Sequence, residues 1–195
     1  DRSVYSNATF NAFTFDNDVN KLATDDTANH TFVRATNEYQ DTEASVKIQS
    51  NEALVDPIGN NGKGNGIYQP LRSSVREGQR EGDRYVTMEY RYYSPSTGGA
   101  DEVSAALTFN NGAEDSGWQT VSIPSEDRDK WKLAKFVYQI TTDAIPDNTN
   151  DYFLLHGDDS NGIVYIDRVR IYSANADGSA IPDEDSDYQH PEVQD

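Results

Sequence analysis

The chain of 195 residues contains no cysteine, so no disulfide can crosslink its fold and no thiol can act in catalysis. No apolar run approaches about 18 residues, the length of a membrane-spanning helix, and we therefore expect no insertion into a membrane. Positive charge is also scarce, because 16 Lys and Arg stand against 34 Asp and Glu, for a formal net charge of −18. This charge argues against binding of nucleic acid by the chain as a whole.

Short runs of alternating or apolar residues recur along the chain, and clusters of Asn, Asp, Gly and Ser separate them. Runs of this kind are typical of β-strands. No segment of ten or more residues carries a convincing helical pattern, and a short helical turn over residues 71–82 is the strongest candidate. We therefore predict an all-β antiparallel sandwich. Its predicted strands cover residues 9–15, 31–35, 44–49, 85–93, 103–109, 119–123, 133–140, 152–156 and 163–172.

The character of the chain changes after the last of these runs. Residues 173–195 carry seven acidic residues and no Lys or Arg, with few apolar groups to support a fold. We predict a domain over residues 1–172 and an acidic C-terminal tail over residues 173–195 that links it to a neighbouring module. The alternative is an ordered calcium loop, since the Asp-rich stretch 181–187 loosely resembles thrombospondin type 3 repeats.

The run at residues 163–172 has a carboxylate, Asp167, among β-branched and aromatic residues. A carboxylate in a buried strand has to be neutralised, hydrogen-bonded or bound to a cation. This stretch resembles the closing strand of the jelly-roll (galactose-binding-like) carbohydrate-binding modules of secreted bacterial polysaccharide-degrading enzymes and adhesins. Residues 13–18 resemble the opening strand of these modules, and residues 83–90 resemble a central strand. The resemblance covers most of residues 9–172 and implies a jelly-roll fold.

The resemblance also implies a structural calcium ion. In such modules the first and last strands lie side by side, and their carboxylates share one Ca²⁺ with backbone carbonyls. The matching positions are Asp16 and Asp167, with Asp18 as an additional ligand. Ca²⁺ accepts six to eight hard oxygens in irregular loops, so the chemistry is suitable. The alternative is that Asp16 caps a turn and Asp167 pairs with Arg168 or Arg34.

Aromatic residues are the candidates for binding sugar, because the C–H faces of sugars stack on rings. In residues 85–93 the strand alternation separates a core-like face from a face that carries Glu89, Arg91 and Tyr93. We predict that Arg91 and Tyr93 bind carbohydrate, together with Trp118 and Trp131 as ring platforms. The alternative for either Trp is packing in the core or at its rim.

The Asn- and Gly-rich segment 60–69, which contains Tyr68, is a second candidate region for sugar, or else a mobile connection. Lys and Arg are concentrated in residues 63–91 and 128–135. Because guanidinium pairs with carboxylate and sulfate, this predicts an anionic, marine polysaccharide. The alternative is that these cations pair with neighbouring acids.

Catalytic motifs are lacking. His30, His156 and His190 stand in unrelated contexts, without HExxH or GxSxG patterns. A jelly-roll polysaccharide lyase would need a Tyr/His/Gln/Arg cluster, whose isolated members are present as Arg76, Gln139, His156 and Tyr165, but its strand signatures are missing. We therefore predict no catalytic residues.

The sequence thus predicts a non-catalytic carbohydrate-binding module with a structural Ca²⁺, bound to a polysaccharide and attached to neighbouring modules of a secreted or cell-surface protein. Two alternatives stay open. One is a calcium-dependent adhesion or peptide-binding domain of a large surface protein, and the other is the jelly-roll lyase.

Overall fold

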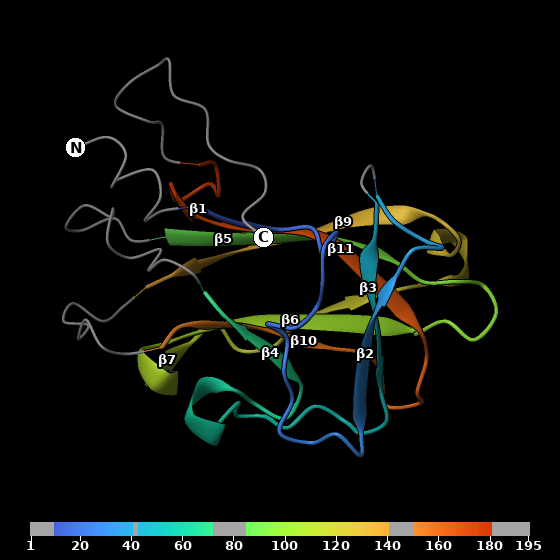
Figure 1. Cartoon of the computed structure of the whole chain (residues 1–195). Helices are drawn as coiled ribbons and strands as arrows, with labels where there is room; N and C mark the ends of the chain where they lie inside the picture. The colour runs from blue at the N-terminus through green and yellow to red at the C-terminus, as the bar shows by residue number, and fades with distance from the viewer. Residues whose placement is uncertain (1–9, 41–42, 72–84, 141–149, 181–195) are drawn as a thin grey trace.

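Two antiparallel sheets stacked face to face form the protein, as Figure 1 shows for the computed structural model. The structure describes residues 10–40, 43–71, 85–140 and 150–180. The first sheet has six strands in the order β2-β3-β11-β5-β9, with β1 paired to β11. The second has five in the order β4-β10-β6-β7, with β8 paired to β6. The predicted all-β sandwich is therefore confirmed.

The strands and three short 3₁₀ turns follow one another along the chain. The bounds are β1 (Phe10–Phe13), β2 (His30–Ala35), β3 (Ser45–Ser50), η1 (Asn60–Gly62), β4 (Ile67–Pro70), β5 (Tyr85–Tyr93), β6 (Glu102–Phe109), η2 (Asn110–Gly112), β7 (Glu114–Asp115), β8 (Gln119–Ser122), η3 (Ser125–Asp127), β9 (Trp131–Gln139), β10 (Tyr152–His156) and β11 (Val164–Ala174).

The hydrophobic core lies between the sheets, because each central strand turns alternate residues inward. On β5 the inward set is Val86, Met88, Tyr90 and Tyr92, all of them buried. Strand β6 contributes Val103, Ala105, Leu107 and Phe109 from the opposite sheet. The intervening residues of β5 consequently form part of the outer face of the six-stranded sheet.

The opening and closing strands lie side by side, as the resemblance implies. Strand β1 pairs with β11 in antiparallel register, with Phe13 opposite Val169. The pairing of β11 with β5 is interrupted between Asp167 and Arg170, where Arg168 has a positive φ of 51°. Such a β-bulge locally bends the strand and changes the direction of its side chains.

Several strand bounds differ from the predicted ones by one to three residues, and two differences are larger in consequence. Strand β4 was not predicted and begins within the segment 60–69, and β11 continues to Ala174, past the predicted end of the domain. Residues 175–180 then fold back as a turn, in which Gly178 O accepts a hydrogen bond of 2.8 Å from Thr87 Oγ1. The predicted helical turn lies almost wholly outside the described residues, as do residues 181–195. No helix among the described residues is long and apolar enough to cross a membrane.

Candidate functional site

Three aromatic rings form a row across the outer face of the six-stranded sheet. Trp131 of β9 is opposite Tyr93 of β5, and Tyr93 is opposite Tyr165 of β11. The ring centroids of Tyr93 and Trp131 are 5.6 Å apart, and those of Tyr93 and Tyr165 are 6.0 Å apart. The register of three neighbouring strands therefore places three rings side by side on one face. We call Trp131, Tyr93 and Tyr165 the aromatic row.

The exposure of the aromatic row changes along it. Trp131 and Tyr93 are half-buried, whereas Tyr165 is only 7% exposed. The Tyr165 hydroxyl accepts a hydrogen bond of 3.2 Å from Asn37 Nδ2. Burial, followed by the nearby carboxylate of Glu38, raises the pKa of Tyr93. Its hydroxyl therefore stays protonated at neutral pH and can donate a hydrogen bond.

Charged side chains follow the row along the same face. Arg91 is opposite Leu133 on β9 and opposite Asp167 on β11. Two residues further, Glu89 is opposite Lys135 and Arg170. Arg170 Nη1 lies 3.5 Å from Glu89 Oε1. The face thus combines rings with both signs of charge.

The other two predicted sugar-binding residues lie elsewhere. Tyr68 and Trp118 pack with a small cluster on the outer face of the five-stranded sheet, whose members include Tyr152. The Tyr68 and Tyr152 rings meet edge to face at 5.5 Å, and Trp118 Nε1 donates to Val55 O at 3.2 Å. The structure therefore brings Arg91, Tyr93 and Trp131 onto one face and separates Tyr68 and Trp118 from them.

The predicted calcium ligands Asp16 and Asp167 both accept backbone hydrogen bonds. Asp16 Oδ1 accepts from the N–H groups of Glu43 and Ala44 at 2.9 and 3.0 Å. Asp167 is fully buried, and its two oxygens accept from Gln40 N at 2.9 Å and from Arg168 N at 2.8 Å. The buried carboxylate is therefore hydrogen-bonded, which is one of the outcomes that its burial requires.

Arg34 bears on whether these residues fit calcium. Its guanidinium donates hydrogen bonds to the backbone carbonyls of Phe15 and Asp16. Oxygen donors of the type that Ca²⁺ prefers are present, but a positive charge already lies at two of the carbonyls. The fit to calcium is therefore partial.

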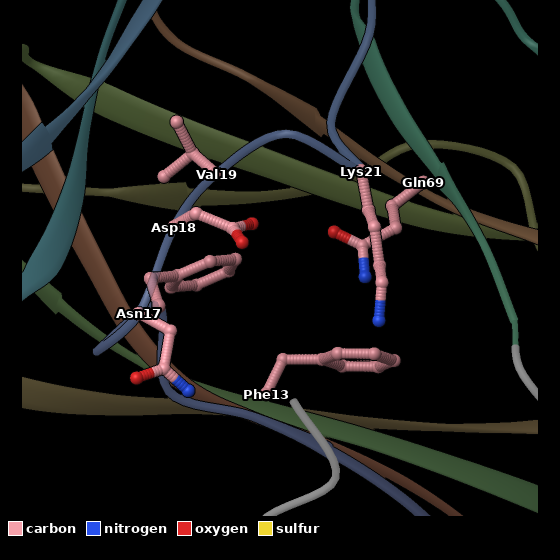
Figure 2. Close-up of a pocket in the computed structure, with 7 residues that line it drawn as sticks. Phe13, Asn17, Asp18, Val19, Lys21 and Gln69 are labelled. Atoms are coloured by element: carbon pink, nitrogen blue, oxygen red, sulfur yellow. The ribbon is translucent and has the colours of Figure 1, made fainter.

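Asp18 lies on a separate feature, a cavity of about 280 Å³ between the segment that follows β1 and strand β4. Figure 2 shows the side chains of Asp18, Lys21 and Gln69 extending toward this cavity, with the ring of Phe13 at its side. Asp18 Oδ1 accepts a hydrogen bond of 3.0 Å from Asn20 N. The remaining lining residues are Phe15, Asn17 and Val19.

Among the described residues, one group of three His, Asp or Glu side chains is placed so that it could hold a metal ion. It consists of His30, Glu52 and His156, whose ligand atoms all lie within 4.8 Å of one another. The predicted set Asp16, Asp18 and Asp167 does not form such a group. Sequence reasoning missed this histidine group, because its members are far apart in the chain. It also missed Tyr165 as a face residue, although Tyr165 shares the strand parity of Asp167.

The isolated residues of the lyase alternative do not come together among the described residues. Gln139 and Tyr165 lie at opposite ends of the six-stranded sheet, since Gln139 is opposite Tyr85 and Tyr165 is opposite Tyr93. His156 belongs to the other sheet. Arg76 lies outside the described residues.

No protein-family model matches the chain, and no curated protein matches it. Solved structures do. One is the CBM22-1 xylan-binding domain of Xyn10C from Paenibacillus barcinonensis, with a TM-score of 0.53 and 10% identity over 85% of this chain and 94% of that chain. The fold is that of jelly-roll carbohydrate-binding modules.

Two further modules support this assignment of the fold. The C-terminal family 22 carbohydrate binding module of Clostridium thermocellum Xyn10B has a TM-score of 0.53 and 17% identity, over 90% of this chain and 98% of that chain. Caldicellulosiruptor saccharolyticus CBM27-1, solved in complex with mannohexaose, has a TM-score of 0.50 and 14% identity, over 86% of this chain and 98% of that chain.

Proposed function

We propose that the protein is a non-catalytic module that binds a polysaccharide on the outer face of its six-stranded sheet. The observation that carries this proposal is the aromatic row, three rings held in register on a face that also presents Arg91 and Glu89. The fold shared with xylan- and mannan-oligosaccharide-binding modules supports it. We also propose that the protein is extracellular and is attached to neighbouring modules of a longer chain.

The chemistry of the face suits a sugar chain. Trp131 and Tyr93 offer apolar ring surface against which the C–H face of a sugar can stack, while the tyrosine hydroxyl can bind its hydroxyl groups. The guanidinium of Arg91 supplies donors two residues from Tyr93 along β5, and the carboxylate of Glu89 supplies an acceptor two residues further on the same face. An open face of this size predicts modest affinity per module, which several modules in one chain would increase by avidity.

The residues of this face also bear on which polysaccharide the protein binds. Arg91, Arg170 and Lys135 lie along one face, and they support recognition of an anionic polysaccharide such as alginate. Leu133, which is 46% exposed beside Arg91, and the two half-buried rings instead support a neutral chain such as xylan or mannan. Affinity electrophoresis in gels that contain each of these polysaccharides separates the two.

Truncation of the rings tests the site. We expect Trp131→Ala and Tyr93→Ala each to weaken binding of the retained polysaccharide at least about tenfold, because each removes stacking surface. Val55→Ala is the control, since Val55 is 51% exposed on the loop that holds Trp118, away from the row. Isothermal titration with oligosaccharides gives the affinities. Full binding by both ring variants, with their thermal stability unchanged, would disprove this site.

We further propose a structural calcium ion at Asp16 and Asp167. The antiparallel pairing of β1 with β11 and the oxygen-rich surroundings support it, whereas the Arg34 guanidinium offers another way to neutralise the same carbonyls. The expected result is that removal of Ca²⁺ with EGTA lowers Tm by several degrees, that added Ca²⁺ restores it, and that Asp167→Asn loses the response. Asp159→Asn, at an exposed loop position, is the control. If EGTA does not change Tm, the proposal is wrong, and the guanidinium of Arg34 is the cation at this position.

A further inference from the structure

The histidine group lies where three strand ends meet. His30 opens β2, Glu52 follows the end of β3, and His156 is the last residue of β10. His30 and His156 are 2% and 1% exposed, and their rings meet edge to face at 5.0 Å. The Glu52 side chain is 26% exposed and leaves one side of the group accessible to solvent. The group thus joins residues of both sheets.

The hydrogen bonds of His156 determine which ring nitrogen carries its proton. His156 Nδ1 lies 2.6 Å from Gly157 O. Because a carbonyl oxygen only accepts, Nδ1 is the protonated nitrogen and Nε2 of the neutral ring keeps its lone pair. This Nε2 atom is buried and has no hydrogen-bond partner among the described residues. A histidine that ligates a metal usually donates its other ring N–H to a carbonyl or carboxylate in this way.

His30 and Glu52 complete the donor set. His30 Nδ1 lies 2.9 Å from Ser50 Oγ, which itself accepts a hydrogen bond from Gly157 N. His30 Nε2 lies 2.7 Å from Glu52 Oε1, and the same oxygen accepts from Asn65 Nδ2 at 3.0 Å. Each ligand side chain is therefore oriented by a further hydrogen bond, as in metal sites with an ordered second layer of contacts.

Two imidazoles and one carboxylate suit zinc better than the alkaline-earth ions. Zn²⁺ binds His nitrogen and carboxylate oxygen tetrahedrally at about 2.0–2.2 Å, often with three protein ligands and a water. Ca²⁺ and Mg²⁺ prefer oxygen ligands throughout. Tetrahedral bonds of this length place ligand atoms about 3.3 Å apart. One ligand atom of each residue lies within 4.8 Å of the others, so no pair would have to approach by more than about 1.5 Å, while His30 Nε2 and Glu52 Oε1, now 2.7 Å apart, would have to separate by about 0.6 Å.

We propose that His30 Nε2, His156 Nε2 and a carboxylate oxygen of Glu52 bind one zinc ion. Binding at His30 Nε2 removes the hydrogen bond to Glu52, and the neutral ring then carries its single proton on Nδ1, where Ser50 Oγ can accept it. The ion links the starts and ends of strands from both sheets, in a chain that has no disulfide. The site is separate from the polysaccharide-binding proposal, because none of its ligands belongs to the aromatic row.

The test uses the full chain after treatment with EDTA and desalting. Titration calorimetry with ZnCl₂ is expected to show one high-affinity zinc per chain. Zinc at 100 times its Kd is expected to raise Tm by about 5–10 °C. Glu52→Gln and His156→Gln are expected to weaken this binding at least about 100-fold. His190→Gln, which changes the third histidine of the chain, is expected to keep it.

Glu52→Gln is the decisive variant if His156→Gln fails to fold. It keeps one oxygen that can accept from Asn65 and replaces the other with an amide NH₂, which removes the negative charge. Added CaCl₂ is expected to change the Tm of Glu52→Gln and of the unchanged chain by the same amount. An effect of Glu52→Gln that appears with zinc alone therefore belongs to this site and not to the one at Asp167. The proposal is overturned if the unchanged chain takes up no zinc, or if Glu52→Gln and His156→Gln bind it as tightly, since the metal would then sit on surface carboxylates.

Discussion

Tyr172 is a tyrosine whose environment strongly disfavours its ionised form. It lies on β11 at the end of the outer face away from the aromatic row and is 8% exposed. Its hydroxyl lies 3.4 Å from Glu89 Oε2. Burial, and then the negative charge of Glu89, raises the pKa of Tyr172 to about 12. The folded protein therefore holds this proton more tightly than the unfolded chain does.

The raised pKa of Tyr172 predicts how stability depends on pH. Since the folded pKa of about 12 exceeds the unfolded value of 10.0, the contribution is complete below pH 10 and is lost as pH rises through 12. Tyr172→Phe lacks this titration. We expect the variant to be less stable by about 1 kcal/mol at pH 7, through loss of the hydroxyl contact, and more stable by about 1–2 kcal/mol at pH 12.

Urea unfolding of both proteins at pH 7, 9, 10, 11 and 12 measures this difference. All other tyrosines and lysines titrate alike in the two proteins, so the difference isolates Tyr172. Stability curves that stay parallel over the whole range would contradict the raised pKa.

At the scale of elements, two turns of identical sequence, Asn-Asn-Gly, pack against each other. They are η1 at Asn60–Gly62 and η2 at Asn110–Gly112, and all four asparagines have φ between 52° and 55°. Gly62 and Gly112 have φ of 86° and 87°. Asn and Gly tolerate these left-handed conformations better than other residues do. Thr108 Oγ1 donates to Gly62 O at 2.7 Å and ties η1 to β6.

The contact between these turns leaves no room for a side chain. A Cβ on Gly62 would lie 2.7 Å from Gly112 N, which is backbone and cannot rotate away. We expect Gly62→Ala to cost about 2–4 kcal/mol, from overpacking added to the strain of a positive φ. Gly98→Ala is the matched control, because Gly98 also has a positive φ of 72° but no atom within 4 Å of its Cβ position. It should cost about 1 kcal/mol.

Chemical denaturation of the two variants gives both free energies. If Gly62→Ala and Gly98→Ala lower the free energy of unfolding equally, the two turns can move apart without loss of stability, and the close contact does not contribute.

Most strands were predictable because their signals are local. Residues 85–93 and 152–156 alternate or run apolar between turn residues, and the strands observed there have those bounds. Strand β4 was missed because it follows an Asn- and Gly-rich stretch and ends at Pro70. A proline of this kind is tolerated at a sheet edge, and β4 is the edge strand of its sheet. Its pairing with β10 depends on contacts far along the chain.

The candidate site was predictable to the extent that strand alternation determines it. The alternation of β5 correctly placed Arg91 and Tyr93 on the face opposite the core residue Tyr90. Trp118 lies outside any strand, so no periodicity could indicate which sheet it covers. The histidine group has no local signature either, because only the folded sandwich brings the ends of β2, β3 and β10 together.

At the scale of the whole molecule, the formal charge of −18 acts on stability as well as on binding. Like charges on a compact surface repel one another, and unfolding relieves that repulsion. Ion pairs offset part of it among the described residues, for example Arg128 with Asp101 at 2.6 Å. The same field repels an anionic polysaccharide at long range, so any preference for one has to arise from close contacts with Arg91 and its neighbours.

Screening of this repulsion should stabilise the fold. Raising NaCl from 10 to 500 mM at pH 7 shortens the Debye length from about 30 Å to a few Å. We therefore expect Tm to rise by about 3–6 °C. Calorimetric scans at pH 7 and at pH 4.5, close to the pI of about 4.3, provide the control, because the net charge nearly vanishes at the lower pH. A salt effect of the same size at both values would show that it does not come from net charge. A fall of Tm with salt at pH 7 would instead mean that local attractions between opposite charges outweigh the repulsion across the surface.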